Sequence, residues 1–226
     1  MRPLIIMHGE KIDWFHTVIR MLMYLAGVAV LALGMSLQTA SGLGVAALTC
    51  FATTLSMLTG KTLGFWITAT YVAYIVAQFA ILRREFQPRI LLELCFSTLI
   101  GGFTDFFMAV NPLHPAALPT QVETMLLSLA VTAFGVSLVV NMGVVPNAPD
   151  GLVQVIAEKI KRRFGDVKVV FDCSHVAVSL VLSLALMHNL GGFGVTTAIS
   201  ALFLGHVINI ANKLFAQRFI RAAFGK

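Results

Sequence analysis

Long apolar segments, each close to the length of a membrane span, occupy most of this sequence. A helix needs about 20 mostly apolar residues to cross the roughly 30 Å hydrocarbon core of a bilayer. Six segments reach or approach that length: residues 17–38, 63–82, 90–110, 122–140, 169–187 and 195–215. Only 12% of the residues are charged, about half the share found in soluble domains. The pattern predicts a membrane protein and argues against soluble enzymes, nucleic-acid-binding proteins and disordered chains.

Two further apolar segments, residues 45–58 and 152–163, are too short to cross a bilayer as helices. The second also ends in four positively charged residues, the first of which is Lys159. We therefore expect both segments to enter the membrane and return without crossing it. The predicted fold class is all-α: a polytopic membrane protein with six transmembrane helices, two short re-entrant half-helices and an inverted repeat.

The two halves of the chain share a sequence motif. The pattern Gly-x-Ser-Leu-x₄-Gly begins at Gly34 and begins again at Gly135, 101 positions later. Both halves also contain the same order of predicted helices: long, short, long and long. We therefore predict an internal repeat, residues 17–112 and 120–217, within a single transmembrane domain that covers residues 1–226.

The positions of Lys and Arg favour one orientation in the membrane. With three crossings in each half, the second half enters the membrane upside down relative to the first. Fifteen of the 16 Lys and Arg residues then face the cytoplasm, together with both termini, and Lys61 faces outside. If all eight helices crossed, the division would be 13 against three. The positive-inside rule thus favours re-entrant helices and makes residues 1–16 a cytoplasmic lead-in at the membrane interface. The net charge of +6 follows from this bias and predicts no nucleic-acid partner.

The broken segments before the two short helices form the predicted binding region. Residues 41–44 are rich in glycine, and residues 143–149 contain a glycine and two prolines. Irregular backbone at membrane depth is tolerated only where protein buries it or where it lines a wet cavity. In transporters built from inverted repeats, such interrupted helices hold the substrate near the middle of the membrane. The free N–H groups of each short helix can bind an anionic or polar group there.

The same segments carry a family resemblance. Residues 41–46 (Ser-Gly-Leu-Gly-Val-Ala), residues 143–152 (Gly-Val-Val-Pro-Asn-Ala-Pro-Asp-Gly-Leu) and the pair Gly102 and Asp105 resemble the YczE/YyaS/YitT family of bacterial integral membrane proteins. The resemblance covers nearly the whole chain, and Pro-x-x-Pro-Asp-Gly-Leu is its most specific part. Where the family has a Pro-Trp-Asp-like triplet, this sequence has Ala47-Leu48-Thr49. The resemblance implies a bacterial inner-membrane protein and does not identify a substrate.

Ionisable side chains within the predicted spans are the main candidates for a binding site. Each costs several kcal/mol in a bilayer unless it is paired or hydrated. Asp105 lies well inside an apolar segment, and Asp150 begins the second short helix. Asp172 and His175 are three residues apart, so they share one helical face and can touch. Structural alternatives exist: Asp150 can cap its helix, Asp172 can pair with Lys168 at the interface, and His175 can simply be satisfied by Asp172.

Six polar residues complete the candidate site for a solute or ion: Ser36, Thr49, Ser137, Asn141, Asn147 and Asn209. Most lie in or beside the broken segments, although serine and threonine in membrane helices often bond only to their own backbone. The three cysteines lie in apolar segments without metal-ligand spacing. No nucleotide-binding, phosphate-binding or zinc-protease motif occurs. We therefore expect no catalytic residue, no metal and no cofactor.

The predicted function is secondary transport of a small polar or anionic solute, with or without proton coupling. In the coupled version Asp105, or Asp172 together with His175, takes up the proton. A channel of the same architecture is a variant. The alternatives are a substrate-binding membrane subunit of a larger transporter and an accessory membrane protein without a ligand. The expected partners are the lipid bilayer and the solute, and small residues on the helix faces also permit a homodimer.

Overall fold

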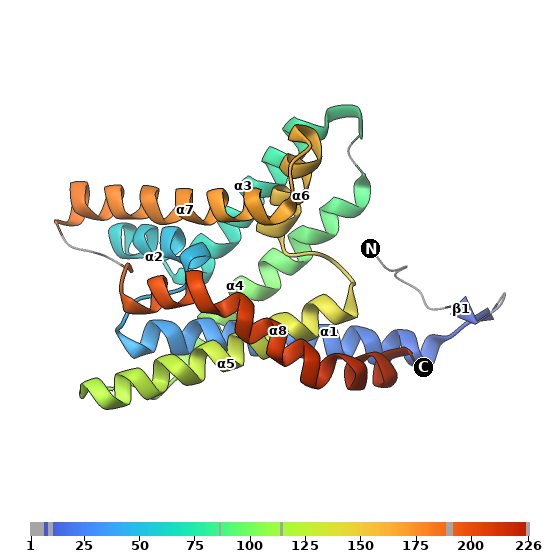
Figure 1. The fold of residues 1–226 in the computed structure, drawn as a ribbon, viewed down its shortest axis with the longest axis horizontal. Helices are drawn as coiled ribbons and strands as arrows, with labels where there is room; N and C mark the ends of the chain where they lie inside the picture. Colours follow the sequence, from blue (N-terminus) through green and yellow to red (C-terminus); the bar gives the residue numbers. More distant parts are fainter. Residues whose placement is uncertain (1–6, 9–10, 86, 114, 189–191, 225–226) are drawn as a thin grey trace.

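A computed structural model describes residues 7–8, 11–85, 87–113, 115–188 and 192–224 of the chain. Figure 1 shows its helices: α1 (Trp14–Ser41), α2 (Ala47–Thr59), α3 (Leu63–Leu82), α4 (Leu92–Val110), α5 (Leu118–Met142), α6 (Ala148–Ile160), α7 (Phe164–Leu182) and α8 (Val195–Phe224). A π-helical turn, Ser183–Met187, extends α7. Two 3₁₀ turns, Arg83–Glu85 and Pro88–Leu91, join α3 to α4. Strands β1 (Met7–His8) and β2 (Lys11–Ile12) pair antiparallel ahead of α1.

Six of these helices are long and apolar enough to cross a membrane: α1, α3, α4, α5, α8 and α7 with its π-helical turn. The prediction of a helical chain with six helices of membrane-spanning length is confirmed. The helices α2 and α6 have 13 residues each, which makes them roughly 20 Å long. Arg2 and Lys226, which enter the predicted charge count, lie outside the described residues.

Several helices extend beyond the predicted boundaries. α8 continues to Phe224, past the expected end at residue 215, because hydropathy marks the apolar part of a helix and not the end of its hydrogen bonding. α6 begins at Ala148 instead of residue 152. Pro149 follows at the second helical position, where its missing N–H leaves no intrahelical hydrogen bond unmade.

Corresponding helices in the two halves end at corresponding residues. α1 ends at Gly42 (φ 70°) and α5 ends at Gly143 (φ 57°). α2 ends at Gly60 (φ 69°) and α6 ends at Lys161 (φ 52°). All four adopt the left-handed conformation that closes a helix, which glycine reaches without steric strain. Each pair is 101 positions apart, the same spacing that separates the two copies of the sequence motif.

The helices α1 and α5 run antiparallel and cross closely at the centre of the molecule (Figure 1). A Cβ atom added to Gly34 would lie 2.8 Å from the backbone nitrogen of Thr132. A Cβ atom added to Gly135 would lie 2.6 Å from the backbone nitrogen of Leu31. Membrane helices approach this closely only where small residues face each other. The crossing is reciprocal, because Gly34 and Gly135, like Leu31 and Thr132, occupy equivalent positions in the two halves.

Each short helix packs against a long helix of the opposite half. α2 packs on α7, and α6 packs on α3. α4 lies beside α1 and α8 lies beside α5, so the outer helices are arranged in the same way in both halves. One difference is that α3 packs extensively on α4, whereas α7 and α8 hardly touch each other among the described residues. Because each half packs its short helix on the other half, an arrangement we call the exchange of short helices, the first turns of α2 and α6 lie between the halves.

Candidate functional site

A cavity of about 520 Å³ lies between the two halves, and residues from all eight helices line it. Much of the wall is apolar, from residues such as Leu31, Met35, Phe96, Val136, Leu204 and Ile208. The polar part of the wall consists of Gln38, Thr49, Tyr71, Thr132, Asn147, Asp150, Lys168, Asp172 and Ser200. Four of the ten predicted site residues, Thr49, Asn147, Asp150 and Asp172, therefore line one cavity.

The first turns of both short helices form part of this wall. Residues 46–49, which are the N-cap residue and first turn of α2, border the cavity. Residues 145–147 directly before α6 and Asp150 in its first turn also border it. Neither helix has a side-chain hydrogen bond at its N-cap, and the first N–H groups of a helix have no partner within it. Gln38 fixes the α2 end: its Oε1 accepts from the Ala46 N–H at 3.0 Å, and its Nε2 donates to Thr132 Oγ1 at 3.3 Å.

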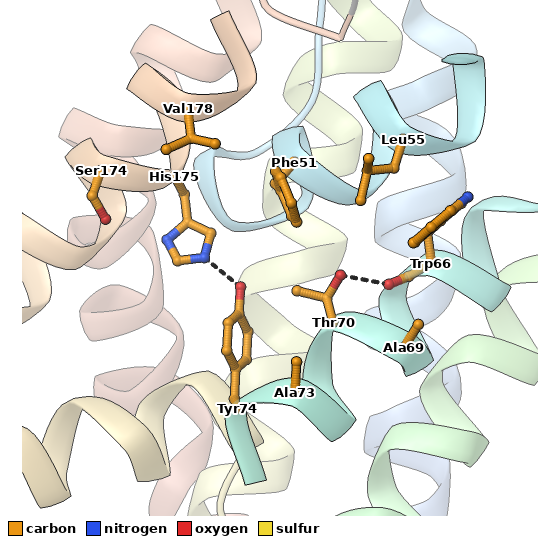
Figure 2. Close-up of a pocket in the computed structure, with 10 residues that line it drawn as sticks. All are labelled: Phe51, Leu55, Trp66, Ala69, Thr70, Ala73, Tyr74, Ser174, His175 and Val178. Carbon is orange, nitrogen blue, oxygen red and sulfur yellow. Dashed lines mark hydrogen bonds between the residues drawn. The ribbon is translucent and has the colours of Figure 1, made fainter. Parts of the chain in front are cut away.

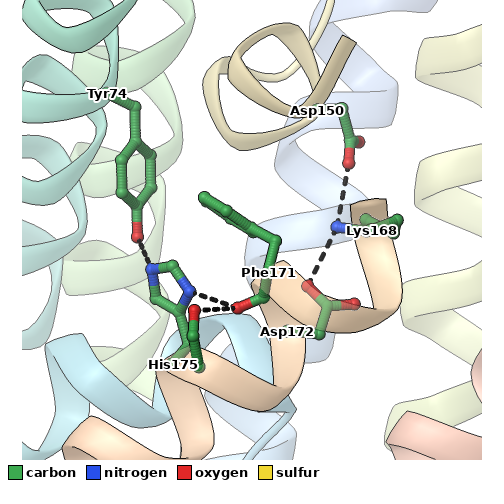
Figure 3. A network of polar contacts seen from close by, with 7 residues as sticks. Tyr74, Asp150, Lys168, Phe171, Asp172 and His175 are labelled. Carbon is green, nitrogen blue, oxygen red and sulfur yellow. Dashed lines mark hydrogen bonds and ion pairs between the residues drawn. The ribbon is translucent and has the colours of Figure 1, made fainter. Parts of the chain in front are cut away.

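Lys168 lies between two carboxylates on the cavity wall (Figure 3). Its Nζ is 3.0 Å from Asp150 Oδ1 and 3.2 Å from Asp172 Oδ1. Lys168 and Asp172 lie on successive turns of α7, whereas Asp150 lies in the first turn of α6. The exposed fraction of the side chain is 22% for Lys168, 27% for Asp172 and 40% for Asp150. We call these three residues the charged triad.

The positions of these residues test two structural alternatives: capping of α6 by Asp150 and pairing of Asp172 with Lys168. Asp150 does not cap α6, because Asn147 is the N-cap residue. Asp172 does pair with Lys168, as the simpler alternative expected, but the pair lies on the wall of the central cavity. The charge count predicts Lys168 at the cytoplasmic surface, whereas its side chain lies on the cavity wall. Its position four residues before Asp172 on the same helical face is the sequence signal that pointed to the pair.

His175 contacts Tyr74 of α3 and does not form the predicted pair with Asp172. Its Nε2 is hydrogen-bonded to the Tyr74 hydroxyl, and its Nδ1 is 2.8 Å from the carbonyl oxygen of Phe171 (Figure 3). Because a carbonyl oxygen only accepts, Nδ1 carries the proton, and in the neutral ring Nε2 accepts from the tyrosine. Asp172 has Lys168 as its partner instead.

A second pocket, of about 330 Å³, lies next to this tyrosine–histidine pair (Figure 2). Its wall comes from α2, α3 and α7 and consists of Phe51, Leu55, Trp66, Ala69, Thr70, Ala73, Tyr74, Ser174, His175 and Val178. One turn away on the same helices, Tyr71 and Asp172 line the central cavity. The two hollows are therefore neighbours along the contact between α3 and α7.

Asp105 of α4 lies outside the wall of the central cavity, and its side chain contacts the start of α3. It accepts a hydrogen bond from the Thr62 hydroxyl at 2.7 Å and another from the Gly64 N–H at 2.7 Å. A carboxylate at this place satisfies free N–H groups and complements the helix dipole. The close approach of Gly101 to Gly64 brings α4 near enough for this contact. The geometry gives Asp105 a role in holding two helices together.

Ser36 and Ser137 form equivalent contacts between helices. The Ser36 hydroxyl accepts from Asn111 Nδ2 at 3.1 Å, and the Ser137 hydroxyl donates to Asn212 Oδ1 at 2.5 Å. Both contacts join residues 75 positions apart. Asn141 donates to the same Asn212 oxygen at 2.8 Å. These contacts tie α1 to the end of α4 and α5 to α8, outside the cavity wall.

Asn209, the remaining predicted site residue, is exposed on α8 and is not part of the cavity wall. A buried acidic residue, Glu93, was missed. Glu93 is only 1% exposed within α4 and accepts from Gln78 Nε2 at 2.8 Å. The criterion that selected Asp105, an acidic residue inside an apolar segment, would have selected Glu93 as well.

Arg20 is a second buried charge that the sequence did not single out, and it is fully buried near the start of α1. Its Nε donates to the Met142 carbonyl at 2.7 Å and its Nη2 to the Gly143 carbonyl at 2.9 Å. The free carbonyls at a helix C-terminus favour a positive charge. The guanidinium also lies 5.2 Å from the centre of the Phe224 ring. Arg20 thus ties α1 to the end of α5 and to the end of α8.

The donor sets do not favour a metal ion. Within the part of the chain that the structure describes, no group of three or more His, Cys, Asp and Glu residues could hold one. In the central cavity the Lys168 ammonium already lies between the carboxylates of Asp150 and Asp172. The three cysteines are free thiols. The cavity therefore offers charged and polar groups for binding a solute.

Comparison with known proteins identifies a family. No curated protein and no solved structure matches the chain. A family described as a family of unknown function (DUF6198) matches residues 18–213. The matched region runs from the first turns of α1 into α8, so it includes every residue on the wall of the central cavity. This chain belongs to the family of unknown function DUF6198.

Proposed function

We propose that this chain is a secondary transporter of a small polar solute and that the central cavity is its binding site. The observation that carries the proposal is a single cavity bordered by the first turns of both short helices and by the charged triad. Ionisable groups at membrane depth are costly and commonly mark solute or ion pathways. Broken helices at that depth persist where they line such a pathway.

The proposed mechanism requires an inverted repeat. Its support comes from the helix ends that correspond at a spacing of 101 positions, the antiparallel α1 and α5, and their reciprocal crossing. In this arrangement α2 and α6 are re-entrant and both termini lie in the cytoplasm. The resemblance to the YczE/YyaS/YitT family is part of the proposal, and with it we propose a bacterial inner membrane as the location. Transport then follows from a rocking of one half against the other.

The two ends of the α1–α5 crossing are closed in different ways, which supports two alternating states. At one end, Arg20 donates to the carbonyls of Met142 and Gly143. The equivalent positions at the other end are Gln121 and Gly42, where a Cβ added to the glycine would lie 3.7 Å from the glutamine Nε2. An exchange of conformation between inverted halves exchanges these two ends. The alternate state therefore opens the Arg20 end and tightens the Gln121 end.

Accessibility of the cavity from both faces of the membrane tests this function. The probe is a single cysteine, Thr49→Cys, in a background whose three natural cysteines are replaced by alanine. Thr49 lines the cavity, and Ser128 of α5 is a matched control, because it is equally buried but lies outside the wall. An impermeant thiol reagent should label Thr49→Cys in both right-side-out and inverted vesicles and should not label Ser128→Cys.

Labelling of Thr49→Cys from only one face would support a binding subunit instead of a transporter. An absence of labelling from both faces would indicate a closed interior and an accessory protein. Uptake by proteoliposomes then provides the direct assay once a solute is known.

A further inference from the structure

The charged triad does not balance its own charge. Asp150 and Asp172 carry one negative charge each when ionised, and Lys168 carries one positive charge. The fully ionised triad therefore has a net charge of −1. An unbalanced charge in surroundings of low dielectric constant is expensive, and one opposite charge removes much of that expense. The triad is thus suited to receive a single positive charge.

Hydrogen bonding at the same place also favours a donor as ligand. The Oδ1 atom of Asn147 is buried and has no hydrogen-bond partner among the described residues. Asn147 lies on the cavity wall three residues before Asp150. The Lys168 ammonium forms ion pairs with both carboxylates, but neither contact has hydrogen-bond geometry, so Asp172 Oδ1 is a second buried acceptor without a hydrogen-bond partner among the described residues. An added ammonium group supplies N–H donors to these oxygens, whereas an added carboxylate or phosphate brings further negative charge next to Asp150 and Asp172.

The rest of the wall fits a hydrocarbon. Leu31, Met35 and Val136 line the cavity on α1 and α5, and Leu204 lines it on α8. The volume of about 520 Å³ is within the range of about 300–1,000 Å³ found for small-molecule sites. Tyr71 and Phe96 also line the cavity, and aromatic faces attract organic cations.

We propose that the solute is an organic amine, bound as its ammonium form by the charged triad, and that it exchanges for a proton. This inference rests on the transport function proposed above. When the site is empty, one carboxyl group of the triad carries a proton and the triad is neutral. Binding of the ammonium group displaces that proton to solution, and no covalent bond to carbon changes. The amine and the proton compete for one negative charge, so the binding site carries only one of them at a time. The amine therefore crosses the membrane in one direction and the proton crosses in the opposite direction.

Among the described residues, the titratable groups around Asp150 and Asp172 include Lys168 and His175 on α7, Tyr71 and Tyr74 on α3, and Glu93 on α4. Glu93 is held by Gln78 and lies outside the cavity wall. His175 holds its Nδ1 proton on the Phe171 carbonyl. The acidic groups on the wall are therefore Asp150 and Asp172.

Two compounds with the same hydrocarbon body and opposite charges test the proposal. Phenethylamine is cationic and 3-phenylpropionate is anionic at neutral pH. Binding to the purified protein is followed by calorimetry in weak buffer, and proton release is followed with a pH indicator. Phenethylamine should bind and release up to one proton per site, and 3-phenylpropionate should not bind. Where the empty triad is protonated, the apparent Kd of the amine should fall about tenfold for each unit rise in pH.

Variants assign the effect to the triad. Asp172→Asn makes the triad neutral without a proton, so it should abolish both amine binding and proton release. Asp150→Asn is a second variant with the same expected result, and it covers the case in which the first variant fails to fold. Glu158→Gln is the control, because Glu158 is exposed on α6 away from the cavity wall. It should bind phenethylamine like the unmodified protein.

Three results would overturn the amine assignment. They are binding of 3-phenylpropionate instead of phenethylamine, binding of neither compound, and amine binding that Asp172→Asn and Asp150→Asn leave unchanged. These results are distinguishable from failure of the transport function. If Thr49→Cys is still labelled from both faces of the membrane, the transporter stands and only the class of solute is wrong.

Discussion

The Tyr74 hydroxyl and the His175 imidazole, which are 101 positions apart, form a hydrogen bond with each other. The same spacing separates the ends of corresponding helices, so each of these residues is the counterpart of the other. In the proposed inverted repeat, a residue can touch its counterpart only close to the axis that would relate the two halves. If the halves exchanged conformation as proposed, this contact would keep the same two partners, whereas the contact between Arg20 and Gly143 would be replaced by one between Gln121 and Gly42.

Loss of the hydrogen bond between Tyr74 and His175 should lower stability without changing the labelling of the cavity from either face of the membrane. Tyr74→Phe removes one hydrogen bond, which is worth about 1 kcal/mol, and we expect a correspondingly lower thermal midpoint. Thr49→Cys should still be labelled from both faces in this variant, at an unchanged ratio. Loss of labelling from one face would show that the Tyr74–His175 pair is a gate.

Removal of the central cation should destabilise the triad. Lys168→Met leaves the carboxylates of Asp150 and Asp172 without their shared partner, and loss of one member of a buried ion pair costs about 3–5 kcal/mol. Because the triad is partly exposed, we expect a smaller loss of about 1–3 kcal/mol. Addition of Asp172→Asn to Lys168→Met should recover part of this loss, as measured by denaturant unfolding. Additive effects of the two substitutions would contradict the pairing.

The close crossing of α1 and α5 predicts a sharp difference between glycines. Gly34→Ala and Gly135→Ala place a methyl group against backbone atoms of the other helix, and such overpacking costs about 1–3 kcal/mol. Gly102 in α4 is the control, since nothing lies within 4 Å of a Cβ added there. Gly102→Ala should leave stability unchanged or raise it slightly, because alanine favours the helix. Equal effects at all three positions would argue against the crossing.

Asp105 and Asp172 should behave differently although both are acidic residues in long apolar helices. Asp105→Asn weakens the contacts to Thr62 and Gly64, which lowers stability by about 1 kcal/mol. It should not alter phenethylamine binding or proton release. Calorimetry on Asp105→Asn and Asp172→Asn, side by side, checks this expectation. A loss of proton release in Asp105→Asn would restore it as a proton-binding residue.

Arg20 lies at one end of the α1–α5 crossing and Gln121 lies at the other. This difference predicts that substitutions at the two ends change the accessibility of the cavity from the two faces of the membrane. Arg20→Gln gives the Arg20 end the same side chain that Gln121 has at the other end, so the two ends become alike. We expect faster labelling of Thr49→Cys from the face on which the chain termini lie. The reverse change, Gln121→Arg, should slow labelling from the opposite face. An unchanged ratio in both variants would mean that Arg20 only stabilises the fold.

The sequence predicted the parts of this structure that depend on local pattern. The six long helices follow from hydropathy, and the match between Gly34 and Gly135 already contained the spacing of 101 positions. Asn147, Asp150 and Thr49 could be predicted because they lie in or beside broken helical segments. Irregular backbone within a membrane must be buried in protein or line a wet cavity.

Other features depend on packing that no local pattern contains. Asp105 lies next to Thr62, 43 positions away, and only the close approach of α3 and α4 directs it there and not toward the cavity. Lys168 was assigned to the surface because charge counting treats every lysine near a helix end as solvated. Its contact with Asp150 requires α6 to pack beside α7. Glu93 was overlooked although its position inside an apolar segment was visible.

The exchange of short helices between the halves has a consequence for how the chain is made. Thr54 of α2 contacts Ser183, at the end of α7, across 129 positions of sequence. During synthesis, α2 therefore leaves the ribosome well before its packing partner does. A chain truncated after the first half would keep that helix surface facing lipid, a state that membrane quality control can recognise. A chain cut in the connection between α4 and α5 should accumulate only when both fragments are produced in the same cell.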